Sequence, residues 1–116
     1  MRSTASTCGA LATARRPLNF ARINMAAMAV LPALLARWLP DGKRVGREYV
    51  ARNPTRADRA PGSFKVVLTG GRAGSWADFA TGDRGGDPVS LCAYLHNMSQ
   101  GEAARALADM LGVSND

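Results

Sequence analysis

The segment from residue 53 to residue 111 constrains the fold most, because strand-like runs, glycine-rich turns and two helix starts follow one another there in a fixed order. In the run 63–69 apolar residues fall at every second position, which predicts a strand with one buried face. Shorter strands are predicted at residues 48–52 and 75–79, the second of them after a glycine-rich turn. The sequence therefore predicts a sheet of at least three antiparallel strands.

Capping residues predict where the C-terminal helices begin. Asp87, with proline next, is typical of an N-cap, and Ser99 with Glu102 three residues later forms a capping box for a last helix that ends at Gly112. A short amphipathic helix is predicted over residues 32–38. The predicted fold class is α+β: a small antiparallel β-sheet of three or more strands, flanked by an N-terminal helix and two C-terminal helices.

Length and the N-terminal composition predict the domain organisation. The 116 residues are enough for one small domain, which we expect over residues 25–116. Residues 1–24 contain four arginines and no acid, a composition typical of a transit peptide or of a disordered arm. A start of translation at Met25 or Met28 is the competing explanation. The apolar stretch at residues 25–39 is too short to span a bilayer, so no membrane role is expected.

Charge is divided unevenly along the chain, whose net charge is +6. Residues 1–72 hold thirteen Lys and Arg against three acids, whereas residues 73–116 hold two against six. This asymmetry favours contact between the front half and a polyanion, with a solvated basic surface that has no ligand as the alternative. Five basic and two aromatic residues are expected around the sheet, and we interpret them as nucleic-acid-binding candidates: Arg52, Arg56, Arg59, Lys65, Arg72, Tyr49 and Trp76.

Basic groups beside aromatic rings suit single-stranded nucleic acid, because the charges contact phosphates and the rings stack on bases. Tyr49 and Trp76 are equally compatible with stacking and with core packing, since a small sheet leaves one face open to solvent. Phe64 and Phe79 are expected in the core.

The sequence gives little support for a metal site or for catalysis. Cys8 and Cys92 are far apart and His96 is the one histidine, so no four-ligand zinc site is present. We expect Cys92 in the core and, from this cysteine usage, a reducing cytoplasmic compartment. Neither a nucleotide-binding glycine motif nor a catalytic constellation occurs, so no cofactor is predicted and the chain by itself is not expected to be an enzyme.

Four motifs, taken in order, resemble the zinc-binding N-terminal domain of bacterial and phage DNA primases, in a form that lacks the zinc ligands. In that family a strand leads into Cys-Pro-x-His, a Pro-Ser-Phe-like strand start follows, the next strand ends in Cys-x-x-Cys, and a Gly-Gly-Asp turn heads a helix. The corresponding segments here are Asn-Pro-Thr-Arg at 53–56, Pro-Gly-Ser-Phe at 61–64, Asp-Phe-Ala-Thr at 78–81 and Gly-Gly-Asp at 85–87. The match extends from about residue 49 to residue 113.

The resemblance implies that Asn53, Arg56, Asp78 and Thr81 stand at the zinc-ligand positions. These residue types make a poor zinc set, so we expect no metal. Zinc in such domains contributes on the order of 10 kcal/mol of folding free energy, and we expect the four side chains to replace it with hydrogen bonds and a charge pair.

The resemblance also implies a role in nucleic-acid binding. The predicted function is a module that binds single-stranded DNA, with RNA as the other possible ligand, in a primase or replication system of a phage, plasmid or integrated element. The alternative is a non-catalytic interaction or regulatory module. It would dock onto a primase, helicase or other replication protein through the apolar faces of its terminal helices.

Overall fold

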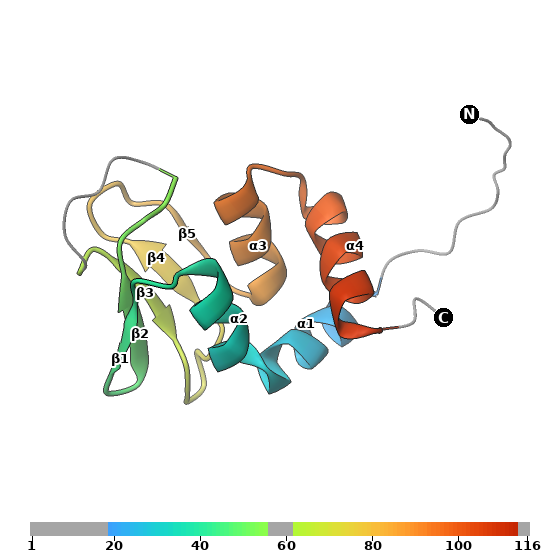
Figure 1. The fold of residues 1–116 in the computed structure, drawn as a ribbon, viewed down its shortest axis with the longest axis horizontal. Coiled ribbons are helices and arrows are strands. Elements are labelled where there is room, and N and C mark those ends of the chain that lie inside the picture. Colours follow the sequence, from blue (N-terminus) through green and yellow to red (C-terminus); the bar gives the residue numbers. More distant parts are fainter. Residues whose placement is uncertain (1–18, 56–61, 114–116) are drawn as a thin grey trace, which may run out of the picture.

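The computed structural model describes residues 19–55 and 62–113, which form four helices and one five-stranded sheet (Figure 1). The helices are α1 (Phe20–Ala29), α2 (Leu31–Trp38), α3 (Pro88–His96) and α4 (Gln100–Leu111). The strands are β1 (Lys43–Val45), β2 (Glu48–Ala51), β3 (Phe64–Val67), β4 (Trp76–Asp78) and β5 (Arg84–Gly85). The α+β prediction is confirmed.

The sheet is a simple meander in which each strand pairs antiparallel with the next along the chain. The three predicted strands correspond to β2, β3 and β4. The two edge strands, β1 and β5, are additional, and they contain three and two residues respectively. Segments this short show no alternation that a sequence pattern could detect.

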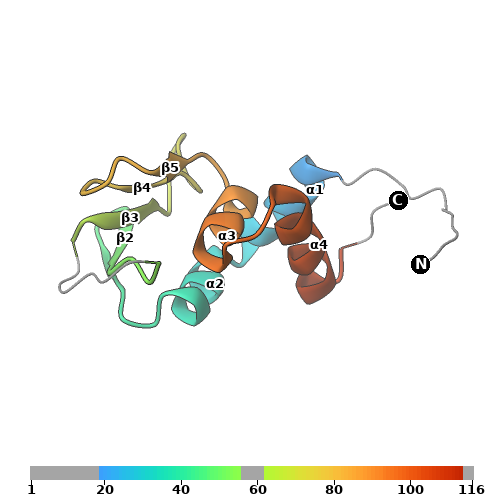
Figure 2. The same ribbon diagram turned by 90° about the horizontal axis from the view of Figure 1, so that it is seen from above.

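Alternation along the strands gives the sheet one covered and one open face. On the covered face, side chains of β2, β3 and β4 pack under α2 and α3, with Leu35 and Leu91 among the helix residues that contact them. The covered face consists of Tyr49, Ala51, Phe64, Val66, Trp76 and Asp78. The other face carries no helix, as Figure 2 shows from above.

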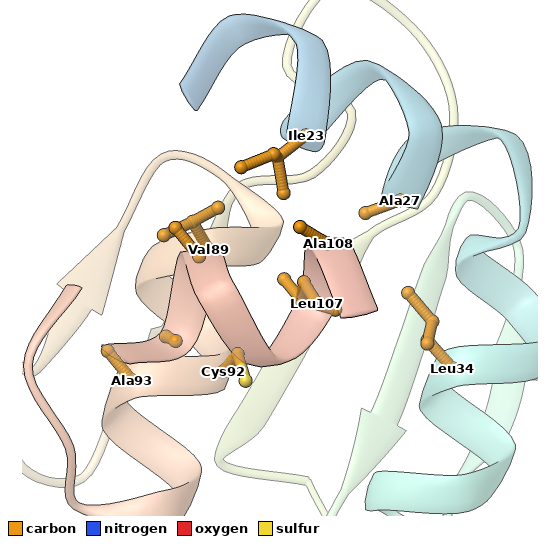
Figure 3. Packing of buried hydrophobic residues seen from close by; sticks show 10 residues of the cluster. Ile23, Ala27, Leu34, Val89, Cys92, Ala93, Leu107 and Ala108 are labelled. Atoms are coloured by element: carbon orange, nitrogen blue, oxygen red, sulfur yellow. The ribbon is translucent and has the colours of Figure 1, made fainter. Parts of the chain in front are cut away.

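A second core lies among the helices, away from the sheet. Ile23 and Ala27 of α1 pack against Val89 of α3 and against Leu107 and Ala108 of α4 (Figure 3). Both C-terminal helices begin as predicted: capping boxes form between residues 87 and 90 and between residues 99 and 102. The hydrogen bonds of the second box lower the pKa of the exposed Glu102 carboxyl, because backbone and hydroxyl donors of Ser99 favour its charged form.

The predicted arm of residues 1–24 is wrong for residues 19–24, which belong to the fold. Asn19 caps α1 by accepting a hydrogen bond from the Arg22 N–H at 3.0 Å, and Ile23 is fully buried. Asn24 Oδ1 accepts a hydrogen bond from the Val89 N–H at 2.9 Å, which ties α1 to the start of α3. The rest of the predicted arm, residues 1–18, lies outside the described residues.

Within the described ranges, no single helix is long and apolar enough to cross a membrane. Helices α1 and α2 together have a suitable length and composition, but the chain bends by 85° between them. Several of their apolar residues are buried inside the protein, with Ile23 and Ala27 in one core and Leu31 and Leu35 in the other.

Candidate nucleic-acid interface

The open face of the sheet bears a hollow of about 1080 Å³ that extends from the turns at one end of the strands to the turn after β4 at the other. Its floor is formed by β3, β4 and β5, and glycines 70, 71, 82 and 86 of the adjoining turns also line it. The charged and aromatic side chains on this face that line it are Arg47, Glu48, Lys65, Arg72, Phe79 and Arg84.

Three cations lie in one row across all five strands of the open face. Strand register pairs Lys43 with Val50, Val50 with Lys65, Lys65 with Ala77, and Ala77 with Arg84. A cation therefore occurs on every second strand, at separations of about 10 Å from backbone to backbone. The apolar residues between the cations, Val50 and Ala77, are short and leave the basic side chains standing above the sheet.

Two more cations lie in the turns at one end of the hollow. Arg47 is in the turn between β1 and β2, and its carbonyl accepts a hydrogen bond from the Leu68 N–H at 2.7 Å, which holds this turn beside the end of β3. Arg72 is in the turn between β3 and β4. Both side chains are exposed, so the basic character of the row continues into these turns.

Glu48 is the acid that faces this basic surface. Its carboxylate lies 3.9 Å from the Lys65 ammonium, and the two side chains are 39% and 35% exposed. A contact this long between partly exposed groups contributes little free energy, so Glu48 does not hold the Lys65 ammonium in a strong ion pair. Among the described residues that line the hollow, Arg47, Lys65, Arg72 and Arg84 outweigh this single exposed carboxylate.

Phe79 is exposed, and the expectation that it lies in the core is wrong. Its side chain is 70% exposed and lies at one end of the hollow, with the Lys65 ammonium 5.5 Å from the ring centroid. Strand parity gives the physical reason. Trp76 and Asp78 point to the covered face, so residue 79 must point to the open one.

The two rings predicted as stacking platforms lie on the covered face. Trp76 is 5% exposed, and its indole N–H donates to Ser90 Oγ at 3.0 Å. A Cβ added at Gly85 would lie 2.5 Å from the indole nitrogen, so the β5 backbone also closes over this ring. Tyr49 is partly buried and its hydroxyl donates to the Leu39 carbonyl at 2.8 Å. Both rings point away from the open face, so of the two interpretations left open for them core packing fits and stacking on that face does not.

The predicted arginines are divided between different surfaces. Arg72 is at the hollow, together with Lys65. Arg52 instead pairs with Asp41 at 2.8 Å and lines a separate hollow of about 290 Å³ beside the end of α2. Arg56 and Arg59 lie outside the described residues. Sequence reasoning did not single out Lys43, Arg47 or Arg84 as contacts, since only strand register and the turn geometry bring them to this face.

Two of the residues at the implied zinc-ligand positions meet beneath the covered face. Asn53 and Asp78 are 25 positions apart in the chain, yet Asn53 Nδ2 donates to Asp78 Oδ2 at 2.7 Å. Both side chains are almost fully buried. The other carboxylate oxygen of Asp78 accepts a hydrogen bond from the Ala80 N–H at 2.8 Å. Paired in this way, a buried carboxylate is compatible with the core.

Tyr94 of α3 extends this pair into a network. Its hydroxyl accepts a hydrogen bond from Asn53 Nδ2 at 2.8 Å and donates to Asp83 Oδ2 at 2.8 Å. Asn53 Oδ1 accepts from both the N–H and the hydroxyl of Thr55. The network therefore joins the end of β2, the end of β4, the turn before β5 and helix α3.

Thr81, the third implied position on a described residue, has a separate role. Its hydroxyl accepts a hydrogen bond from the Asp83 N–H at 3.3 Å within the turn between β4 and β5. The fourth position, Arg56, lies outside the described residues. In the part of the chain that the structure describes, no three His, Cys, Asp or Glu side chains come close enough to share a metal ion.

The cysteine and histidine of α3 lie one helical turn apart. Cys92 is buried, which raises the pKa of its thiol, and its sulfur is 3.7 Å from His96 Nδ1. The same nitrogen is 3.0 Å from the Cys92 carbonyl oxygen. Cys92 belongs to the helical core, as the sequence predicts.

The chain matches no family model among known protein families, and no curated protein matches it. The description of the site therefore depends on its geometry. That geometry is a small α+β domain whose sheet is covered by helices on one face and carries a basic hollow with an exposed phenylalanine on the other.

Proposed function

We propose that this protein binds single-stranded nucleic acid, with DNA as the first candidate, on the open face of its sheet. The row formed by Lys43, Lys65 and Arg84 carries the proposal, because it crosses the whole sheet in one register. Cations along a surface neutralise phosphates and release counterions, which is the main source of affinity in nucleic-acid binding without sequence specificity. The predicted contact of Arg52 is not part of this interface, since Arg52 lines another hollow, and Arg56 and Arg59 lie outside the described residues.

The resemblance to the primase zinc-binding domain supports the same function. In a domain of that kind the ligand positions must converge, and Asn53 and Asp78 do converge despite their separation in sequence. A hydrogen-bond network that joins four chain segments can hold the loops that zinc holds in the family. We therefore propose a zinc-free, primase-like module that acts without a cofactor in replication of a phage, plasmid or integrated element. A cytoplasmic location fits this role.

The alternative function, docking onto a replication protein through the terminal helices, finds less support in the geometry. The apolar residues of α1 and α4 are used inside the protein, where Ile23 and Ala27 contact Leu107 and Ala108. Isolated exposed residues such as Met25 and Met110 remain on these helices. Single exposed apolar side chains are normal on protein surfaces and do not define an interface.

Fluorescence anisotropy of a labelled, mixed-sequence single strand at several salt concentrations tests the proposal. A variant with Lys65→Gln and Arg84→Gln removes two cations of the row, and the matched control Arg37→Gln with Arg105→Gln removes two exposed arginines on helices α2 and α4. For a single strand the slope of log K against log salt should fall by about 0.7 per lost contact, or about 1.4 in the first variant. The control should keep the slope of the unmodified protein.

Two results would overturn the proposal. Equal slopes for the row variant and the control would show that the charge acts without a defined surface. An unmodified protein that fails to bind at low salt would exclude nucleic acid altogether. The matching duplex and the same sequence as RNA, measured in parallel, decide which strand type is preferred.

A further inference from the structure

We infer that Phe79 and Lys65 together form a nucleotide subsite, in which the phenylalanine ring stacks on an unpaired base and the lysine ammonium contacts a phosphate of the same or the next nucleotide. The inference rests on the proposed function, because it assigns particular atoms of the strand to particular side chains. It also adds a contribution to affinity that does not depend on salt.

The exposure of Phe79 is the first observation. At 70% it is the most exposed aromatic side chain among the described residues, and the ring lies at the basic hollow. An aromatic face open to water beside cations is the arrangement on which bases of single strands stack. Most other large apolar side chains that are exposed do not share this setting: Met25, Phe20 and Val30 belong to the α1–α2 region, and Met110 to α4. Val45 of the edge strand β1 is exposed on the open face but has no aromatic ring on which a base could stack.

The backbone around Phe79 is fixed on both sides, although the ring is free. Its N–H donates to the Ser63 carbonyl at 2.7 Å, and the preceding residue is the buried Asp78, whose carboxylate also holds the Ala80 N–H. A ring presented from a fixed backbone loses little conformational entropy on stacking. The buried network on the covered face thus holds in place a residue on the open face.

The position of Lys65 is the second observation. Its ammonium lies 5.5 Å from the Phe79 centroid and 3.9 Å from Glu48, and both contacts are weak. The lysine side chain is long and flexible, and its ammonium lies beside the ring, so it can reach a phosphate of a nucleotide whose base stacks on that ring. Arg84, two strands away in the same row at about 10 Å, is in position for a phosphate farther along the strand.

This geometry selects single strands. In a duplex the faces of the bases are stacked on one another, so a ring on a sheet surface reaches a base only where the strand is unpaired. The subsite therefore predicts a preference for single strands over duplexes that comes from Phe79, whereas the cations of the row attract both.

The test is a set of single substitutions measured by the same anisotropy titration. Phe79→Ala should weaken binding by about 5- to 150-fold with the salt slope unchanged, as expected for the loss of one stacked base. Phe79→Tyr should retain the affinity, and Lys65→Gln should instead lower the slope by about 0.7. Met25→Ala, which removes another exposed apolar side chain on α1, is the matched control and should have no effect.

A strand that carries one abasic nucleotide gives the decisive comparison. If a base stacks on Phe79, moving the abasic position along a short strand should weaken binding to the unmodified protein at one or two positions, and Phe79→Ala should be insensitive to it. Unchanged affinity of Phe79→Ala, with salt-dependent binding by the unmodified protein, would overturn the subsite and leave the proposed function intact. No binding by the unmodified protein would overturn both. Because the ring is exposed, equal urea unfolding midpoints should confirm that the variant is folded.

Discussion

The two faces of the sheet are built from the same strands and have opposite chemistry. On the covered face Phe64, Trp76 and Tyr94 of α3 form a group of rings whose centroids lie 4.6 to 6.1 Å apart. On the open face β3 carries Lys65 and β5 carries Arg84, and both side chains line the hollow. Alternation by single residues separates the part of the protein that is packed from the part that is available for binding.

Residues 78 and 79 show the contrast most sharply, because they reverse the usual preference. The carboxylate of Asp78 is buried and the ring of Phe79 is exposed. Burying a carboxylate is costly unless it is hydrogen-bonded, and Asp78 has partners in Asn53 and in the backbone of the following turn. An exposed aromatic side chain gains nothing from the core. We interpret Asp78 as a structural residue whose hydrogen bonds on the covered face hold Phe79, the candidate binding residue, in place on the open face.

Truncating the centre of the covered face should have the largest effect on stability. Phe64 is fully buried between Trp76 and Tyr94, so Phe64→Ala should lower the free energy of unfolding by about 3–5 kcal/mol. Urea titration followed by circular dichroism measures this change. A loss below about 1 kcal/mol would mean that the covered face is not the main source of stability. The contrast between a packed face and an open face would then no longer hold.

Removing the buried polar pair of Asn53 and Asp78 should have the next largest effect on stability. Asp78→Ala removes the carboxylate that accepts hydrogen bonds from the Asn53 amide and the Ala80 N–H, at a cost of about 1–3 kcal/mol, while the Asn53 amide keeps its bond to the Tyr94 hydroxyl. The double variant of Asn53→Ala with Asp78→Ala should be more stable than the sum of the single effects predicts, by about 0.5 kcal/mol or more, since the two side chains share one interaction. Strict additivity would show that the network does not act as a unit.

Much of the fold follows from local signals in the sequence. Capping residues predict where helices α3 and α4 begin, and the alternation of apolar residues predicts strands β2, β3 and β4. These signals can be recognised because they need only a few neighbouring residues. Helix α1 was missed although Asn19 is a good N-cap and Phe20, Ile23 and Ala27 have helical spacing. The arginine-rich composition of the preceding residues favours an arm over a helix in this short segment.

The candidate site was less predictable, because it depends on which residues the strands place side by side. Lys65 and Arg72 were singled out and do line the hollow, whereas Arg84 belongs to the acidic half of the chain and comes to the row only through pairing with β4. Of the aromatic residues, Trp76, for which the sequence leaves stacking and core packing open, is buried, and Phe79, which the sequence places in the core, is exposed. Deciding between them requires the strand parity and the contact of Trp76 with Ser90, which is 14 positions away.

The pH dependence of stability tests the environment of Tyr49 at the edge of the covered face. Burial first, and the negative charge of Asp41 second, raise the pKa of the Tyr49 hydroxyl above its ordinary value. The folded state therefore holds this proton more tightly than the unfolded chain. The stabilisation is complete below about pH 10, the unfolded value, and is lost as the pH rises through the folded pKa.

Tyr49→Phe should consequently reduce the fall in unfolding free energy above about pH 10. It should also cost about 1 kcal/mol at neutral pH, because the Leu39 carbonyl loses one of its two donors and keeps the Gly42 N–H. Asp41→Asn removes the second cause alone and should bring the pKa of Tyr49 part of the way back, as an ultraviolet titration of the phenol can show. A Tyr49→Phe variant whose stability declines with pH as steeply as that of the unmodified protein would contradict the assignment.

The smallest effect on stability is expected from the variant with the largest effect on charge-driven binding. Lys65→Gln with Arg84→Gln removes the 3.9 Å contact between Lys65 and Glu48, which is partly exposed, and an exposed arginine on a two-residue edge strand. Substitutions of this kind change the unfolding free energy by about 0.5 kcal/mol or less each. The urea midpoint should therefore match that of the unmodified protein while the salt dependence of binding falls. A loss of more than about 1 kcal/mol would mean that the cationic row stabilises the sheet, and the division between a packed face and a binding face would no longer hold.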